Sequence, residues 1–137
     1  ISQLKKTNTF LNSRKKSFFY YVKEFKKLSK FISIPKYENY NSSSFHLFLI
    51  HLNLKYLKFG KDKLFRYLNK KKIFPQFHYK PLNMYSFYKK KTESFIGAKK
   101  YFKSTLSIPL YYGIKISEQK YILDNIKKFI NDNKIKN

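Results

Sequence analysis

The feature that most constrains the fold is a short apolar segment, SFHLFLIHLNL, which has no polar face. Phe45, Leu47 and Leu49 alternate with Phe48 and Ile50, so both sides of an extended strand carry large apolar side chains. A strand of this kind is stable only when other elements cover both of its faces. We therefore expect it at the centre of a small sheet that is covered by helices.

Helical periodicity flanks this strand on both sides. From Gln3 to about Lys30, apolar residues recur at steps of three, four or seven and predict one long amphipathic helix. A second helix is expected over KLFRYLNKKK, with Asp62 accepting an amide at its start, and a third over FIGAKKYFKSTL. In the last helix, Ser117 is the expected N-cap and Glu118 favours the positive helix end. The apolar stripe of that helix consists of Ile122, Ile126, Phe129 and Ile130.

Prolines and small polar residues mark the segments between the helices. Pro35 and the run ENYNSSS predict a loop. Pro75 and Pro81 exclude a helix from IFPQFHYKP and predict a short strand or extended segment, and LSIPLYYG is expected to be an extended connector. Strand, helix and strand in this order indicate a βαβ-like or split unit. The predicted fold class is α+β, with an α/β-type small domain.

The chain has 137 residues and a formal net charge of +24, which is the electrostatic footprint of a nucleic-acid binder. NMYSFYKKK also interleaves aromatic rings with lysines, as single-strand binders do. However, Arg14 and Arg66 are the only arginines, although base readout and bidentate phosphate contacts favour arginine. The abundant residues are those of A- and T-rich codons, so we attribute the charge to codon composition. A small basic RNA-binding protein of ribosomal type is the alternative.

Several kinds of chemistry lack the residues that they need. There is no cysteine, and His46, His51 and His78 are not spaced as a metal pair. We interpret His46 as a core histidine of the apolar strand. The scattered carboxylates form no acid–base pair, so we expect no catalytic residue and no metal ligand. The longest apolar run is about half as long as a membrane helix and no signal peptide is recognised, so a cytoplasmic protein is expected.

The ordered series of segments resembles the C-terminal part of the DegT/StrS family of sugar-nucleotide aminotransferases. ISQLKK, Arg14 and Tyr21 resemble the family's long interdomain helix, and SSSFHLF is similar to its SSYHLF strand. KDKLFRYLNKKKIFPQFHYKPL resembles a segment that leads into QVHYxPL, and LSIPLYYGIKISEQKYI resembles LSLPLYPGLTEEEQDYV. The chain departs from this pattern where Lys72 replaces a glycine, Asn83 a frequent histidine and Tyr112 a proline.

This resemblance implies a fold-type-I, aspartate-aminotransferase-like enzyme that uses pyridoxal phosphate (PLP). Residues 1–31 would form the interdomain helix and residues 45–131 the small α/β domain. The family's large PLP domain and its Schiff-base lysine precede the segment that this chain resembles. No cofactor-binding residue is therefore expected here, and the fragment alone is expected to be inactive. A degenerate pseudogene product is a third alternative.

The resemblance also implies a substrate site and partners. The nearest likeness is to family members of the pseudaminic acid pathway, in cell-surface or flagellin glycan synthesis, which aminate a UDP-linked 4-keto-6-deoxy sugar. A UDP-sugar and glutamate are then the expected partners, with a homodimer for the full-length protein, no membrane association and no nucleic acid. The expected substrate-binding residues are Gln76, Phe77, His78 and Tyr79.

Overall fold

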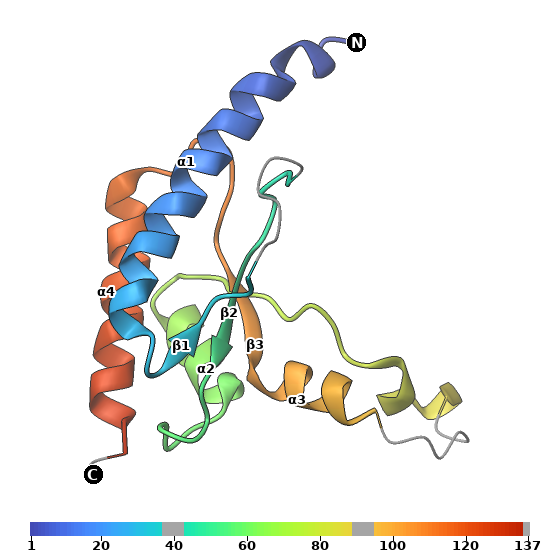
Figure 1. The fold of residues 1–137 in the computed structure, drawn as a ribbon, viewed down its shortest axis with the longest axis vertical. Helices are drawn as coiled ribbons and strands as arrows, with labels where there is room; N and C mark the ends of the chain where they lie inside the picture. The colour runs from blue at the N-terminus through green and yellow to red at the C-terminus, as the bar shows by residue number, and fades with distance from the viewer. Residues whose placement is uncertain (37–42, 89–94, 136–137) are drawn as a thin grey trace.

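The computed structural model describes residues 1–36, 43–88 and 95–135. Its longest helix, α1 (Thr7–Phe25), is extended at both ends by single 3-10 turns, at Leu4–Lys6 and Lys26–Leu28. This confirms the long amphipathic helix predicted from the sequence. The start of α1 extends beyond the body of the molecule (Figure 1), which explains why the predicted stripe is exposed there at Leu4. Further along α1, the side chains of Phe18, Tyr21 and Phe25 are fully buried.

Three short antiparallel strands form the sheet: β1 (Ile32–Ser33), β2 (Phe48–Leu52) and β3 (Thr105–Ile108). Their spatial order is β1-β2-β3, so the apolar strand lies at the centre, as predicted. In the register of the sheet, His51 is paired with Thr105. Leu49 is paired with Ser107. Because alternate residues of a strand point to the same side, one face of the sheet carries the side chains of Leu49, His51, Thr105 and Ser107.

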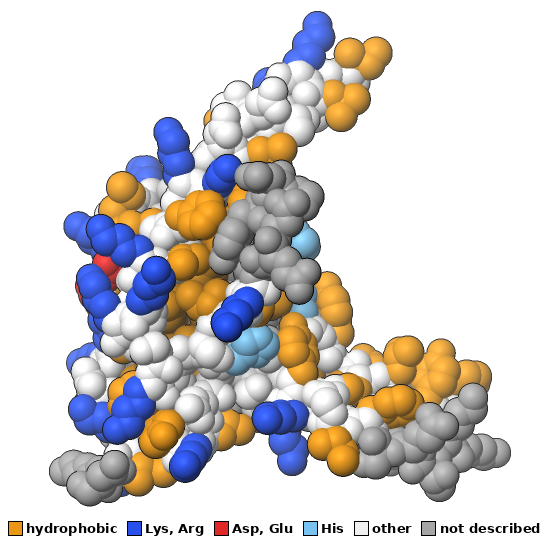
Figure 2. Space-filling model, in the orientation of Figure 1, with side chains coloured by type: hydrophobic (Ala, Val, Ile, Leu, Met, Phe, Trp, Pro, Cys, Tyr) orange, Lys and Arg blue, Asp and Glu red, His pale blue; other side chains and the backbone are white. Residues whose placement is uncertain are grey.

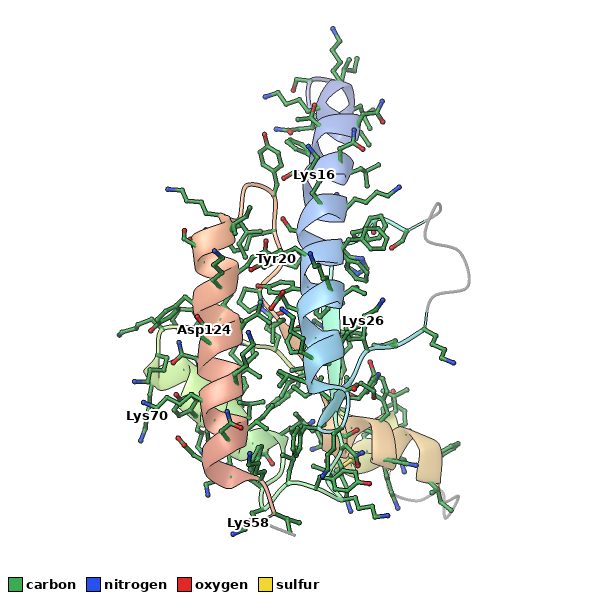
Figure 3. The ribbon with its side chains drawn as sticks, turned by 60° about the vertical axis from the view of Figure 1, so that its left-hand side comes forward. Lys16, Tyr20, Lys26, Lys58, Lys70 and Asp124 are labelled. Carbon is green, nitrogen blue, oxygen red and sulfur yellow. The ribbon has the colours of Figure 1, made fainter. Side chains whose placement is uncertain are left out.

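The opposite face of the sheet holds the core. Phe48, Ile50 and Leu52 of β2 are buried on this face, where the ring of Phe48 packs 4.9 Å from the ring of Tyr21 in α1. The last helix, α4 (Ile116–Asn133), runs beside α1 (Figures 1 and 3), and Tyr20 and Asp124 lie along the seam between the two helices. The stripe predicted for α4 is confirmed, because its four members are all buried: Ile122, Ile126, Phe129 and Ile130.

On the face of the sheet that carries Leu49 and His51, these two side chains are only half-buried, although the sequence predicted full cover on both sides, whereas Thr105 and Ser107 on the same face are buried. The element that lies on this side is α3 (Ile96–Ser104), which has no buried residue of its own. The ring of Tyr101 in α3 packs edge-on against His51, with centroids 5.4 Å apart. A short, largely exposed helix therefore leaves part of this face open.

The segment between Phe74 and Leu82 is extended, but it forms a single bridge instead of a strand. The N–H groups of Gln76 and Ser107 each donate to the carbonyl oxygen of the other residue, at 3.0 and 2.9 Å. Because this bridge and the β2–β3 pairing are both antiparallel, the segment runs in the direction of β2, with β3 between them. Helix α2 (Lys61–Lys70) connects β2 to the segment. This is the split unit that the sequence predicted.

Several sequence-based boundaries were wrong. The sequence assigned TLSI partly to the end of the third helix and partly to the extended connector, but these four residues form strand β3. Strand β1 was not predicted. The N-cap of α2 is Gly60, and Asp62 lies in the first turn without capping it. In α4, the Glu118 carboxylate accepts the N–H of Lys115 at 2.7 Å, which places the cap two residues before Ser117. Most of the ENYNSSS loop lies outside the described residues.

Candidate functional site

A cavity of about 680 Å³ lies between the segment after α2, the end of β3 and the start of α4. Apolar side chains line much of it, among them the buried Ile73, Ile108, Leu110 and Ile122. Such a mixture of an apolar lining with a few polar groups is typical of small-molecule sites. The polar groups are contributed by His46, Lys72, Gln76, Ser107, Ser117 and Glu118, with Tyr111 and Tyr121.

Glu118 organises one end of this cavity. Its carboxylate accepts the N–H of Lys115 with one oxygen and the hydroxyl of Tyr111, at 3.2 Å, with the other. Burial, followed by the negative charge of Glu118, raises the pKa of Tyr111. The phenol therefore keeps its proton at neutral pH and remains a hydrogen-bond donor to Glu118.

Two of the expected substrate-binding residues meet at Ser107. Gln76 is held there by its backbone bridge, and its exposed side chain lines the cavity. His78 places its Nε2 2.8 Å from the Ser107 hydroxyl, whereas its Nδ1 is buried without a partner among the described residues. Burial and the nearby His46 lower the pKa of His78, so its imidazole is neutral at physiological pH.

The other two expected residues lie on either side of this pair. The ring of Phe77 stacks on Phe65, with centroids 4.6 Å apart, and joins the edge of the core. Tyr79 is 75% exposed and packs edge-on against His78, at 4.8 Å between ring centroids. The segment thus directs Phe77 inward as an anchor and presents Gln76, His78 and Tyr79 outward or toward Ser107.

His46 is not the core histidine that the sequence suggested. It is exposed, its Nδ1 lies 3.0 Å from the hydroxyl of Ser44, and it lines the cavity. The physical reason is that β2 begins only at Phe48, after Phe45 has entered the left-handed region at a φ of 48° and ended the strand-like alternation. Sequence analysis also missed Ser107, because TLSI alone carries too short a pattern to indicate a strand.

Lys61, the first residue of α2, lies between two aromatic rings. Its side chain is 3% exposed, and its Nζ lies 3.4 Å from the ring centroid of Phe102 and 4.2 Å from that of Phe77. Burial lowers the pKa of Lys61, and the neighbouring Asp62 partly offsets this shift. The Nζ has no hydrogen-bond partner among the described residues, so cation–π attraction replaces the hydration that the ammonium loses.

Over residues 1–36, 43–88 and 95–135, no group of histidine, cysteine or acidic side chains has the geometry to hold a metal ion. Within the same ranges, no helix combines the length and apolar character needed to cross a membrane.

The fold of this chain matches part of the fold of solved aminotransferase structures. The structure of Helicobacter pylori PseC, an aminotransferase involved in the biosynthesis of pseudoaminic acid, matches 96% of this chain and 35% of its own length, with a TM-score of 0.85 at 24% identity. The aminotransferase TlmJ from Streptoalloteichus hindustanus matches the same share of this chain and 34% of its own, with a TM-score of 0.84 at 19% identity.

The sequence comparisons identify the family. The model of the DegT/DnrJ/EryC1/StrS aminotransferase family matches residues 1–127, and the chain belongs to this family. A UDP-4-amino-4,6-dideoxy-N-acetyl-beta-L-altrosamine transaminase from Campylobacter jejuni is 35% identical over 128 residues, or 92% of this chain. That match covers 34% of the relative, so the chain spans about a third of the length of the relatives it matches. The resemblance predicted from HYKP and the flanking motifs is confirmed.

Proposed function

We propose that this chain is the substrate-side, C-terminal portion of a PLP-dependent aminotransferase that transfers an amino group to a UDP-linked 4-keto-6-deoxy sugar. The observation that supports this most strongly is the family match over residues 1–127. The name of the Campylobacter relative supports the choice of sugar. Glutamate as the amino donor, a homodimer for the full-length protein and a cytoplasmic location belong to the same proposal.

In this proposal, Gln76 to Tyr79 form the sugar-facing edge of the site. The Gln76 amide offers both a donor and an acceptor to sugar hydroxyls. His78 is held by the Ser107 hydroxyl at 2.8 Å, with its Nδ1 buried, and fixes the position of the segment that carries Gln76 and Tyr79. Tyr79, which is exposed, adds ring area for packing against the ligand. Phe77 holds the segment in register through its stacking on Phe65.

We propose no PLP contact for this chain. In the family that the chain resembles, the lysine that forms the imine with PLP precedes the matching segment. Lys61 is buried between the rings of Phe77 and Phe102 and is not proposed as a counterpart of that lysine. In the proposed division, residues 1–31 form the interdomain helix and 45–131 the small domain.

The net charge alone favours the RNA-binding alternative, but the distribution of charge over the face shown in Figure 2 does not. Over the face shown in Figure 2, lysine and arginine side chains are spread along the helices and the lower body instead of forming one stripe. The family match gives the aminotransferase proposal a basis that the RNA-binding alternative lacks. We therefore propose no RNA-binding function for this chain.

The test is a calorimetric titration of the chain with the UDP-linked 4-amino sugar, the product of the proposed reaction. We expect saturable binding that is weakened at least fivefold in His78→Ala and restored in part by His78→Gln, whose amide can still reach Ser107. Tyr79→Ala should weaken binding more than Tyr85→Ala, a matched change of another exposed tyrosine. Equal effects of the two tyrosine variants, or an unchanged affinity in His78→Ala, would count against the proposed site.

A further inference from the structure

A second pocket, of about 440 Å³, lies on the α3 side of the sheet. It is bounded by residues from the turn before β1, from β1 and β2, and from one face of α3, and it shares no lining residue with the larger cavity. The proposed transaminase site makes no use of it. Its lining consists of Ser29, Ser33, His51, Leu52, Asn53, Gly97, Lys100, Tyr101 and Ser104.

The chemistry of this lining favours an anion. It contains a lysine, three serines, a histidine and an asparagine but no carboxylate. Lys100 takes part in none of the ion pairs found among the described residues. The hydroxyls of Ser29 and Ser33 likewise have no hydrogen-bond partner within that part of the chain. An ammonium group and hydroxyls that line one pocket are a combination that binds phosphoryl oxygens well.

His51 supplies a further donor whose orientation is fixed. Its Nδ1 lies 2.6 Å from the hydroxyl of the buried Thr105, and the ring of Tyr101 packs against its edge. Burial lowers the pKa of His51, so the ring is neutral at physiological pH. When the Thr105 hydroxyl donates to Nδ1, the proton of the neutral imidazole is on Nε2, which is then a donor.

We propose that this pocket binds the phosphoryl group of a phosphorylated small molecule, with Lys100 as the charged contact and the hydroxyls of Ser29 and Ser33 and the His51 ring as hydrogen-bonding contacts. A pocket of about 440 Å³ has room for more than one phosphate, since ligand pockets range from about 300 to 1,000 Å³. The ligand is therefore a phosphate ester or diphosphate, or free phosphate. This inference does not depend on the proposed transaminase activity, because the two pockets share no lining residue.

The test is calorimetric titration of the 137-residue chain at physiological salt with inorganic phosphate and, separately, with UDP. Lys100→Gln should weaken binding about tenfold, as expected for the loss of one charge-assisted hydrogen bond. Lys99→Gln removes the same charge from the same helix, outside the pocket, and should change affinity less than twofold. This control is essential because a chain with a net charge of +24 attracts anions everywhere.

A third variant adds bulk to the lining of the pocket without removing charge. Gly97 lines the pocket and has no atom within 4 Å of the position that a Cβ would take, so Gly97→Leu introduces a larger side chain without a clash at Cβ, and we expect it to weaken binding about as much as Lys100→Gln. Tighter binding of UDP than of phosphate that is weakened in Lys100→Gln but kept in His78→Ala would assign the pocket to nucleotide-linked ligands, and equal binding of the two probes would assign it to the phosphoryl group alone. No saturable binding of either probe, equal losses in Lys99→Gln and Lys100→Gln, or unchanged affinity in Gly97→Leu would overturn the proposal.

Discussion

The turn after α2 precedes the HYKP segment (residues 78–81), and its backbone conformation can be tested quantitatively. Lys72 has a φ of 59°, in the left-handed region that favours glycine. Its N–H donates to the Asn69 carbonyl oxygen and the N–H of Ile73 donates to that of Leu68, both at 3.0 Å. These two bonds form a Schellman motif, in which glycine normally occupies the position of Lys72. The chain thus keeps the turn despite the residue that departs from the family pattern.

The change Lys72→Gly should stabilise the chain. A left-handed conformation costs a residue with a Cβ roughly 1–2 kcal/mol, whereas the extra backbone freedom of glycine costs about 0.5–1 kcal/mol on folding. Lys72 is exposed, so little packing is lost. The net gain in the free energy of unfolding is about 0.5–1 kcal/mol. With an m value of about 1.7 kcal/mol/M, the urea midpoint should rise by roughly 0.3–0.6 M.

The assay is urea unfolding followed by circular dichroism, with Lys71→Gly as the matched control. Lys71 is also exposed but has a φ of −89°, which any residue adopts, so glycine there should lower the free energy of unfolding by about 0.5–1 kcal/mol. The two lysines are adjacent and carry the same charge, so electrostatics cannot explain opposite signs. A midpoint that falls in Lys72→Gly, or one that rises equally in both variants, would refute the argument.

Two further predictions concern buried polar groups. The folded-state pKa of Lys61 lies below the ordinary value of 10.5, so the unfolded state binds more protons between the two values. The free energy of unfolding of the wild type should therefore increase relative to that of Lys61→Met as the pH rises through the lowered pKa toward 10.5. The measurement is the urea midpoint of both proteins as a function of pH, and a difference between the midpoints that does not change with pH would contradict the prediction. The side chain of Gln119, 1% exposed, donates to the Ser17 carbonyl oxygen at 2.9 Å. Gln119→Met should lower the free energy of unfolding by about 0.5–1.5 kcal/mol because the Ser17 carbonyl oxygen, which also accepts a bond within α1, loses its side-chain donor. The surface change Lys120→Met should stay within about 0.5 kcal/mol in the same urea experiment.

The elements that could be predicted from the sequence are those with a long pattern of their own. The stripes of α1 and α4 extend over several turns, and the apolar run of β2 has no polar face, so each pattern indicates its structure without knowledge of the rest. β1 and β3 are short, with two and four residues, and they exist because they pair with β2. Such strands are set by tertiary contacts, which local propensity does not report.

The candidate site was predictable only in part for the same reason. The resemblance pointed to Gln76 and His78, but their common partner Ser107 lies 29 residues beyond His78 and becomes a neighbour through the single bridge to β3. The inward direction of Phe77 depends on the stacking partner Phe65 in α2, and the exposure of His46 depends on where β2 begins. Each of these facts is a consequence of pairing between distant segments.

The most direct test of the central claim is an activity measurement on a chimera. Residues 1–137 would replace the corresponding C-terminal third of the Campylobacter transaminase, so that the relative supplies the rest of the enzyme. We predict that the PLP-loaded chimera transfers an amino group to the UDP-linked 4-keto sugar. His78→Ala should raise the KM for the sugar at least fivefold while leaving the PLP absorbance unchanged. A chimera that folds and loads PLP but shows no transfer would contradict the account.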